Sequence, residues 1–187
     1  MSTEKIKSTI ANPAPLGLLG FGMTTVLLNL HNANIIPLSI VIVAMGLTIG
    51  GVSQIVAGIM EFLKNNVFGA TAFTAYGFFW LSLIVIWINP TSDITAADEK
   101  SMGFYLLLWG IFTAFMFIGT LKHNRCTQFV FLSLTVLFFM LAIGDFTGNA
   151  AIKIAAGWVG IVCGASAIYN SVAQIINNEY GKEILPL

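Results

Sequence analysis

Charge is scarce in this sequence. Only 9% of the 187 residues are Asp, Glu, Lys or Arg, and 57% are hydrophobic; an average soluble domain carries roughly 25% charged residues. Eight basic and eight acidic residues give zero net charge, and the mean hydropathy is +0.90. So little charge cannot coat a water-soluble globule. The composition excludes a soluble enzyme, a disordered chain and a nucleic-acid-binding protein, which needs a basic patch.

Cysteine and histidine are almost absent too. Cys126 and Cys163 are too few for a disulfide framework or a zinc cluster. A haem-binding bundle needs axial ligands such as histidine, and His31 and His123 are expected at opposite faces of a membrane. Ser166 has no histidine at its depth to activate it for an intramembrane protease. We therefore expect no metal, no other cofactor and no enzymatic activity.

Long apolar runs are what the sequence has instead. Each is near the ~20 residues that cross a ~30 Å hydrocarbon core as a helix, and none alternates as β-barrel strands do. The chain is therefore predicted to be an all-α membrane protein with six transmembrane helices. The six runs cover about residues 16–30, 38–62, 67–88, 102–121, 129–143 and 150–176.

Six spans place both chain ends on the same side of the membrane. If that side is the cytoplasm, the distribution of basic residues follows the positive-inside rule. We expect a multi-pass protein of the cell membrane, with a cytoplasmic segment 1–15, a transmembrane domain 16–176 and a cytoplasmic tail 177–187. Lys100 and Lys153 then lie outside, and the inside residues are Lys5, Lys7, Lys64, Lys122, Arg125 and Lys182.

Glycines within the predicted spans indicate close helix contacts. Gly46 and Gly50 form one GxxxG pair, and Gly160 and Gly164 form another. Small residues let helix backbones approach each other in lipid. Contacts within one bundle are the simpler interpretation, and contacts between subunits are the alternative.

Polar residues inside spans are costly and are therefore candidates for function. Charged side chains are almost absent from the predicted bundle centre, because Glu61 is expected at a span end near Lys64 and Asp145 in a loop. This pattern favours a passive path for a small polar solute: water, urea, ammonia, glycerol or a small carboxylic acid. Hydroxyls and amides dominate the set, which includes Thr24, Thr25, Asn29, Gln54, Thr71, Thr74, Tyr169, Asn170 and Gln174.

One segment near the start of the chain resembles a family signature. The run Asn12, Pro13, Ala14, Pro15, Leu16, Gly17 and Leu18 is similar to the signature of the acetate uptake transporter family. The similarity continues at residues 21–25, 28–32, 69–77, 129–138, 156–158 and 163–169 and covers essentially the whole chain.

The resemblance implies six transmembrane helices per subunit and a homohexamer with one pore in each subunit. It implies transport of acetate, with succinate and other small monocarboxylates as further candidates, across the lipid bilayer of the cell membrane. It places a hydrophobic constriction at Phe21, Tyr76 and Leu134, and a position that influences solute size at Ala167. The Tyr76 hydroxyl is expected to add one hydrogen-bond donor to this constriction.

Neutral polar groups near the constriction are expected to hold the solute weakly enough to release it. The predicted carboxylate-binding residues are Thr24, Thr25, Asn29, Thr71 and Thr74, and the further pore-lining candidates are His31, Gln54, Glu61 and Tyr169. An anion crosses a dry ring at high cost, and no mid-membrane proton carrier is evident, so protonation of the solute itself is one route.

Three classes of function stay open on the residues alone. The first is an acetate channel or proton-coupled permease. The second is a urea, amide or ammonia channel of similar architecture. The third is a membrane enzyme or sensor that transports nothing.

Overall fold

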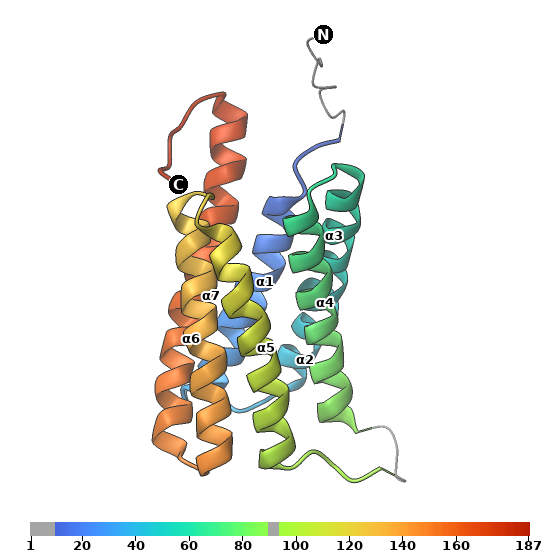
Figure 1. Cartoon of the computed structure of the whole chain (residues 1–187), viewed down its shortest axis with the longest axis vertical. Helices are drawn as coiled ribbons and strands as arrows, with labels where there is room; N and C mark the ends of the chain where they lie inside the picture. The colour runs from blue at the N-terminus through green and yellow to red at the C-terminus, as the bar shows by residue number, and fades with distance from the viewer. Residues whose placement is uncertain (1–9, 90–93) are drawn as a thin grey trace.

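Six membrane-spanning segments make up the fold (Figure 1). The computed structural model describes residues 10–89 and 94–187, which form helices and loops and no strand. The elements are α1 (Ala14–Asn32), α2 (Ile40–Met45), η1 (Gly46–Ser53), α3 (Gln54–Leu63), α4 (Val67–Ile88), α5 (Glu99–Thr120), α6 (Arg125–Thr147) and α7 (Ala150–Tyr180). Because α2, η1 and α3 form one span, the predicted six-helix, all-α fold is confirmed. Lys5 and Lys7 lie outside the described residues.

The helices extend beyond the apolar runs that predict them. The fifth run, 129–143, becomes α6 from Arg125 to Thr147, and α7 continues to Tyr180. Asp145 was expected in a loop, and this is wrong, because it lies in the last turns of α6. Its Oδ1 pairs with Lys153 Nζ of α7 at 2.7 Å. That ion pair neutralises the carboxylate, so the helix continues through a charged position.

Asparagine and aspartate side chains begin four of the helices. Asn66, Asn124 and Asn149 accept hydrogen bonds from backbone N–H groups in the first turns of α4, α6 and α7. Asp98 and Ser101 form a capping box on α5. The Ser101 backbone N–H donates to Asp98 Oδ1 at 2.6 Å, which lowers the pKa of this exposed carboxyl. These caps satisfy N–H groups that the helices leave unpaired.

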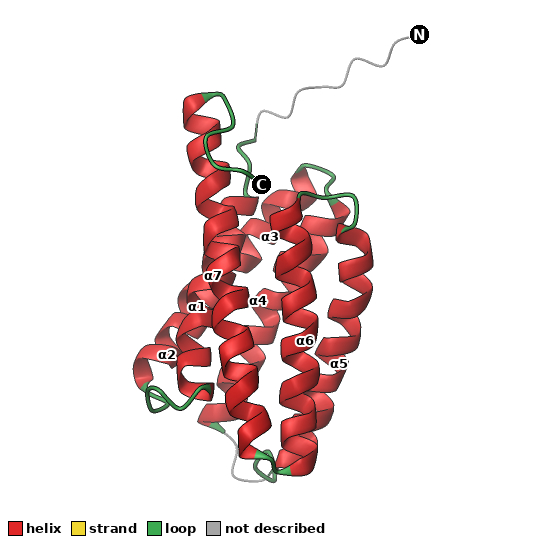
Figure 2. Ribbon diagram, turned by 90° about the vertical axis from the view of Figure 1, so that its left-hand side faces the viewer, coloured by secondary structure: helices red, strands yellow, loops and turns green. Residues whose placement is uncertain are grey.

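Figure 2 shows the spans running roughly parallel in one bundle, and the contacts between neighbouring helices close this bundle into a ring. Its order is α1, α7, α6, α5, α4 and the α2–η1–α3 span, which returns to α1. Large aromatic side chains fill the space between α4 and α5. Phe79 stacks on Tyr105 with ring centroids 5.7 Å apart and meets Trp109 edge-on at 5.2 Å. The start of α1 and the C-terminus lie at one end of this ring (Figure 1), here called the N/C end.

Glycine lets α1 and α7 approach within backbone contact. A Cβ on Gly164 would lie 2.7 Å from the Gly22 carbonyl oxygen, and one on Gly22 would lie 2.7 Å from the Gly164 oxygen. Real Cβ atoms do not approach other atoms so closely, so neither position accepts a side chain without moving a helix. The second half of the Gly160/Gly164 pair therefore serves contacts inside the bundle.

The middle of the second span is a π-helix. It covers eight residues, Gly46–Ser53, and is flanked by the α-helical segments α2 and α3. π-helical turns are rare and occur frequently at functional sites. Gly50 in this segment packs against the Trp80 ring of α4. The hydropathy of the span did not predict this change of helix type.

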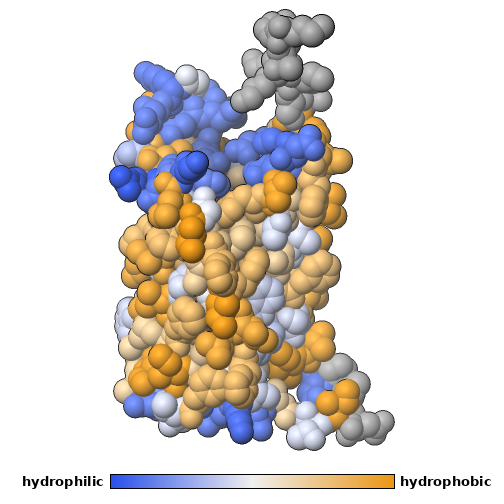
Figure 3. Space-filling model, viewed as in Figure 1, coloured by the Kyte–Doolittle hydropathy of each residue, from blue (hydrophilic) through white to orange (hydrophobic). Residues whose placement is uncertain are grey.

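Apolar side chains cover the visible outer face of the bundle between two hydrophilic ends (Figure 3). Exposed large hydrophobic residues occur on all six spans, with Phe115 of α5 at 71% exposure. The hydrocarbon core of a bilayer is the solvent that such a surface requires. The chain is therefore a multi-pass membrane protein.

Candidate transport path

A cavity of about 170 Å³ lies at the N/C end of the bundle. It lies among the first turns of α1, α4 and α6, the end of α3, the α3–α4 and α5–α6 loops, and α7. A buried water needs about 10–15 Å³ by the same measure, so the cavity has room for several waters or a small organic solute. We call it the mouth cavity, and its polar wall consists of Glu61, Asn66, His123, Asn124, Thr127 and Gln174.

Two narrow cavities continue from it through the bundle. The first, of about 20 Å³, shares the wall residues Leu18, Ala72, Phe73 and Phe131 with the mouth cavity. The second, of about 30 Å³, shares Phe21, Tyr76 and Leu134 with the first. Each has room for one to three waters. Because successive cavities share wall residues, the three lie in a row through the bundle, and this row is here called the path. The first narrow cavity is called the upper cavity and the second the lower cavity.

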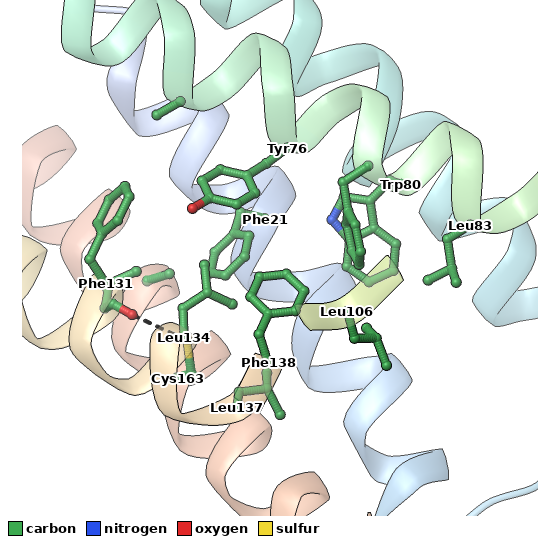
Figure 4. Packing of buried hydrophobic residues seen from close by; sticks show 14 of the residues in the cluster. Phe21, Tyr76, Trp80, Leu83, Leu106, Phe131, Leu134, Leu137, Phe138 and Cys163 are labelled. Carbon is green, nitrogen blue, oxygen red and sulfur yellow. Dashed lines mark hydrogen bonds between the residues drawn. The ribbon is translucent and has the colours of Figure 1, made fainter. Parts of the chain in front are cut away.

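Phe21, Tyr76 and Leu134 lie where the upper and lower cavities meet (Figure 4). They come from α1, α4 and α6, and each is at most 7% exposed. The Phe21 and Tyr76 ring centroids are 6.1 Å apart, with the planes tilted by 49°. The structure therefore brings the three residues of the predicted constriction together at one level of the path.

The Tyr76 hydroxyl is used by a neighbouring helix. It lies 2.8 Å from Thr113 Oγ1, and Thr113 in turn donates its hydroxyl proton to the Trp109 carbonyl oxygen at 2.7 Å. A threonine hydroxyl has one proton, so Tyr76 is the donor in its bond to Thr113. The constriction thus presents aromatic and aliphatic carbon to the path, and the hydroxyl donor expected there is engaged on α5.

Several buried polar atoms beside the path have no hydrogen-bond partner in the described structure. These are Gln54 Oε1 in the upper cavity wall, and Thr25 Oγ1 and Trp80 Nε1 in the lower cavity wall. Most buried polar groups in proteins are hydrogen-bonded, so each exception asks for a partner. A water or a polar solute in the path supplies one, and the three atoms stand on both sides of the Phe21–Tyr76–Leu134 ring.

The other predicted polar residues divide by position. Asn29 lines the lower cavity, donates to the Thr25 carbonyl oxygen at 2.8 Å and accepts from Asn32 at 3.0 Å. Thr24 is fully buried but donates to the Gly20 carbonyl oxygen at 2.8 Å, outside the three cavities. Thr25, Asn29, Gln54, Glu61 and Gln174 are thus the predicted polar residues that the structure places in the path wall.

Five predicted positions besides Thr24 lie away from the three cavities. Thr71 is exposed on the outer face of α4, and Thr74 packs against Gly58 of α3. The His31 ring is 3.2 Å from the Ile36 carbonyl oxygen at the end opposite to the termini. Tyr169 donates to the Pro186 carbonyl oxygen at 2.9 Å, and Ala167 is fully buried in the core.

The signature segment fastens α1 at the mouth cavity. Asn12 donates to Gln174 Oε1 at 3.0 Å, and its Oδ1 accepts from Lys64 Nζ at 3.4 Å. The Ser171 hydroxyl donates to the Pro15 carbonyl oxygen at 2.6 Å. The signature therefore ties the start of α1 to α7 and to the end of α3, and its residues Ala14 and Leu18 line the cavity.

Four polar wall residues were not predicted as site residues: Asn66, His123, Asn124 and Thr127. They lie in or beside the α3–α4 and α5–α6 loops, and their spacing in the sequence carries no motif. Asn66 and Asn124 each cap a helix, which gives them a structural reason to be present. In the sequence, the one feature that points to these residues is the asparagine at each of the two loop–helix junctions.

Glu61 is buried rather than lying at an open boundary. Its side chain is 1% exposed, and its Oε2 accepts from Asn66 Nδ2 at 2.8 Å. Lys64, expected as its neighbour, reaches Asn12 instead. The mouth cavity therefore has a carboxyl group in its wall.

Sequence comparisons identify the relatives of this chain. The profile described as the GPR1/FUN34/yaaH family matches residues 2–184. The succinate-acetate/proton symporter SatP of Escherichia coli (strain K12) is 56% identical over 179 residues, which covers 95% of each chain. The ammonia transport outward protein 2 of Saccharomyces cerevisiae is 37% identical over 177 residues, 90% of this chain and 63% of the yeast protein.

A solved structure has the same fold. The structure of the bacterial acetate channel SatP superimposes with a TM-score of 0.94 at 55% identity, over 96% of this chain and 99% of that one. The resemblance inferred from the signature segment is confirmed, because family profile, relatives and fold agree over nearly the whole length. This chain belongs to the GPR1/FUN34/yaaH family.

Proposed function

We propose that this chain transports acetate, with succinate and other small carboxylates as further substrates, across the cell membrane. The observation that carries this function is the row of three cavities interrupted by the apolar ring of Phe21, Tyr76 and Leu134. The names of the bacterial relatives, an acetate channel and a succinate-acetate/proton symporter, support acetate as the solute. The function is transport and not catalysis.

The ring acts as a hydrophobic gate. A dry constriction excludes ions and their hydration shells until it widens or the solute sheds its charge. On either side, the unpaired atoms of Thr25, Gln54 and Trp80 exchange hydrogen bonds with the solute. Only the hydroxyl and the indole N–H can donate to a carboxylate, and the Gln54 oxygen accepts from water or from a carboxylic acid. Such neutral partners hold the solute weakly enough for release.

The N/C end faces the cytoplasm in this proposal. The basic residues Lys64, Lys122, Arg125 and Lys182 lie at or beyond the helix ends on that side. At the opposite end, Lys153 is paired with two carboxylates. This distribution supports the orientation by the positive-inside rule, and it makes residues 177–187 and the segment before α1 cytoplasmic.

The subunits assemble into a homohexamer with one path in each. The resemblance to the acetate uptake transporters supports this state, and the apolar outer face supplies surface for lipid and for neighbouring subunits. Mass determination of the purified chain in detergent tests it, and a monomeric mass contradicts it.

Acetate flux into liposomes that contain only this protein tests the function. Labelled acetate is expected to enter saturably, to be displaced by unlabelled acetate, and to exceed the leak into protein-free liposomes. Flux of urea without flux of acetate would overturn the proposal. Repeating the assay with and without a pH gradient separates a channel from a proton-coupled permease.

Ammonia is the second candidate solute, because the yeast relative is named for ammonia transport. The buried Glu61 carboxyl at the mouth also suits an ammonium cation. Methylammonium flux in the same liposomes decides between the two. Methylammonium flux that acetate does not inhibit, with no acetate flux, would favour this candidate.

A further inference from the structure

Glu61 is more buried than any other acidic residue in the described chain. Asp98, Glu99, Glu179 and Glu183 are exposed and Asp145 is partly exposed, whereas Glu61 is 1% exposed. It nevertheless lines the mouth cavity, so its carboxyl group meets whatever enters the path from the N/C end.

No cation neutralises this carboxyl within residues 10–89 and 94–187. The ion pairs among these residues are those of Lys153 at the opposite end. Lys64 donates to Asn12, and Arg125 donates to Gln128 Oε1 at 3.1 Å. A buried charge without a cation partner is costly. Glu61 is therefore not held as one half of a structural ion pair.

Asn66 holds one oxygen of the carboxyl group. Its Nδ2 donates to Glu61 Oε2 at 2.8 Å, while its Oδ1 accepts from the Gly69 backbone N–H at 3.2 Å. The second bond fixes the amide orientation. No hydrogen bond from the described residues reaches Oε1, so this oxygen is free to bind a solute or water in the cavity.

The elements around Glu61 bring one other titratable group to the cavity wall. The first turns of α1 contribute Ala14 and Leu18, α4 contributes no ionisable residue near Glu61, and α7 contributes Gln174. The α5–α6 loop contributes His123, whose ring lies edge-on to Phe68 with centroids 4.7 Å apart. Charge in the mouth cavity is therefore set by Glu61, His123 and the solute.

Two carboxyl groups in contact cannot both be ionised in a site shielded from water. A carboxylate solute beside Glu61 meets this condition, because Glu61 is 1% exposed and no cation of the described residues pairs with it. The pair becomes stable when one proton lies between the two groups, as in the aspartic-protease dyad. Binding of the solute then takes up one proton.

We propose that Glu61 and the carboxyl group of the solute share one proton in the mouth cavity, so that proton uptake accompanies binding. This rests on the proposed function and names the residue that couples the proton to it. The proton comes from water at the mouth when the acetate anion binds beside the Glu61 carboxylate. When the acid leaves for the ring it keeps this proton in its O–H bond, and Glu61 is again the carboxylate that it was before binding. The neutral acid then enters the apolar ring without the cost of desolvating an anion.

Calorimetric titration of the purified, full-length protein with acetate tests this coupling. Titrations in buffers of different ionisation enthalpy give the number of protons taken up, and titrations from pH 6 to pH 8 give the change in Kd. One shared proton corresponds to about one proton per acetate and about a tenfold weaker Kd for each unit of rising pH. In Glu61→Gln the amide donates to the acetate anion, so proton uptake falls to about zero and the Kd changes by less than about twofold across the range.

Three further variants keep the test decisive. Glu183→Gln removes an exposed carboxyl and His123→Gln removes the other titratable wall group, and both are expected to keep the wild-type proton uptake. Glu61→Asp keeps a protonatable group and is expected to keep it with weaker binding. If Glu61→Gln cannot be purified, Glu61→Ala makes the same test, and loss of proton uptake is again the expected result.

Other outcomes overturn it. Unchanged proton uptake in Glu61→Gln means that the solute carries its proton without Glu61. Loss of uptake in His123→Gln assigns the proton to the imidazole, and loss in Glu61→Asp shows that a carboxyl group is not sufficient. If the wild-type protein neither binds nor transports acetate at any pH, the proposed function itself is wrong.

Discussion

Acidic side chains have different partners at the two ends of the bundle. At the end away from the termini, Lys153 Nζ lies 2.7 Å from Asp145 and 3.1 Å from Glu99. At the N/C end, Glu61 is more deeply buried and has an amide as its hydrogen-bond partner in place of a cation. Ion pairing at the first end joins α5, α6 and α7. At the second end, the Glu61 carboxyl accepts one hydrogen bond, from Asn66, and a neutral glutamine could accept the same bond.

Under the proposed function, the charges at the first end are structural and the carboxyl at the second end takes part in transport. A paired, partly exposed carboxylate contributes modestly to stability and has no free chemistry. A buried, unpaired carboxyl in a cavity wall costs stability, and such groups are typical of sites that exchange protons or bind ligands. We therefore expect mutations at the mouth to change transport and mutations at the opposite end to change stability.

Replacing a helix cap at each end is expected to give the largest difference between the two ends. Asn66→Asp keeps the acceptor for the Gly69 N–H but puts a second carboxyl against Glu61. The new pair holds a proton and a negative charge of its own, so acetate flux at neutral pH is expected to fall at least about tenfold. Asn149→Asp makes the same change at the start of α7, and its flux is expected to stay within about twofold, because the aspartate also caps. Equal losses in the two variants would contradict the distinction.

Widening the ring between the two ends tests whether selection occurs there. Leu134→Ala shortens a side chain that is 3% exposed in the constriction. Flux of lactate, which is larger than acetate, is expected to rise several-fold while acetate flux is kept. Leu132→Ala is the matched control, since Leu132 lies on the same helix at 47% exposure. Unchanged selectivity in Leu134→Ala would count against the position of the constriction.

Removing the cation at the opposite end has a smaller effect. Lys153→Met breaks both ion pairs and is expected to lower stability by about 1 kcal/mol or less, as partly exposed pairs do. Acetate flux should not change. Thermal unfolding in detergent measures the loss, which should shrink at high ionic strength. A loss of flux larger than the loss of folded protein would assign a transport role to this end as well.

The α5 cap is expected to give the smallest and most pH-dependent effect. Hydrogen bonds from Ser101 lower the pKa of Asp98 from its ordinary value of 3.8. The stabilisation is therefore complete above that value and is lost as the pH falls through the lowered pKa. Asp98→Ala should melt slightly below the wild type at neutral pH, and the difference should vanish in acid. Asp98→Asn keeps an acceptor that does not titrate, so its melting temperature should not show this acid-dependent loss. A constant difference between wild type and Asp98→Ala would contradict the assignment.

The sequence predicts the six spans because each apolar run is long enough to act alone. The ends of the helices are less predictable, because a charged residue can lie within a helix when a side chain of opposite charge is near it. Asp145 illustrates this: its partner is eight positions away in sequence, on the next helix. The family signature predicts the constriction residues, and the structure brings them together.

The mouth cavity is less predictable from the sequence. Its wall comes from α1, α3, α4, α6, α7 and two loops, so no short motif carries it. Glu61 stands three residues before Lys64, a spacing typical of a surface ion pair, and only the fold shows that the lysine points elsewhere. Thr71 and Tyr169 show the reverse case, since polar residues in a predicted span can face outward.

The π-helix in the second span controls the rotational phase of the residues that follow it. Buried positions of this span recur every four residues at 42, 46, 50 and 54, and such a spacing drifts about 40° per step around a regular α-helix. A wider turn in the middle corrects that drift and keeps Gln54 and Glu61 on the inner face. Deleting one residue between 46 and 53 would turn residues 54–63 by about 100°. The chain would still span the bilayer with the same hydropathy, but its mouth carboxyl would face away from the path.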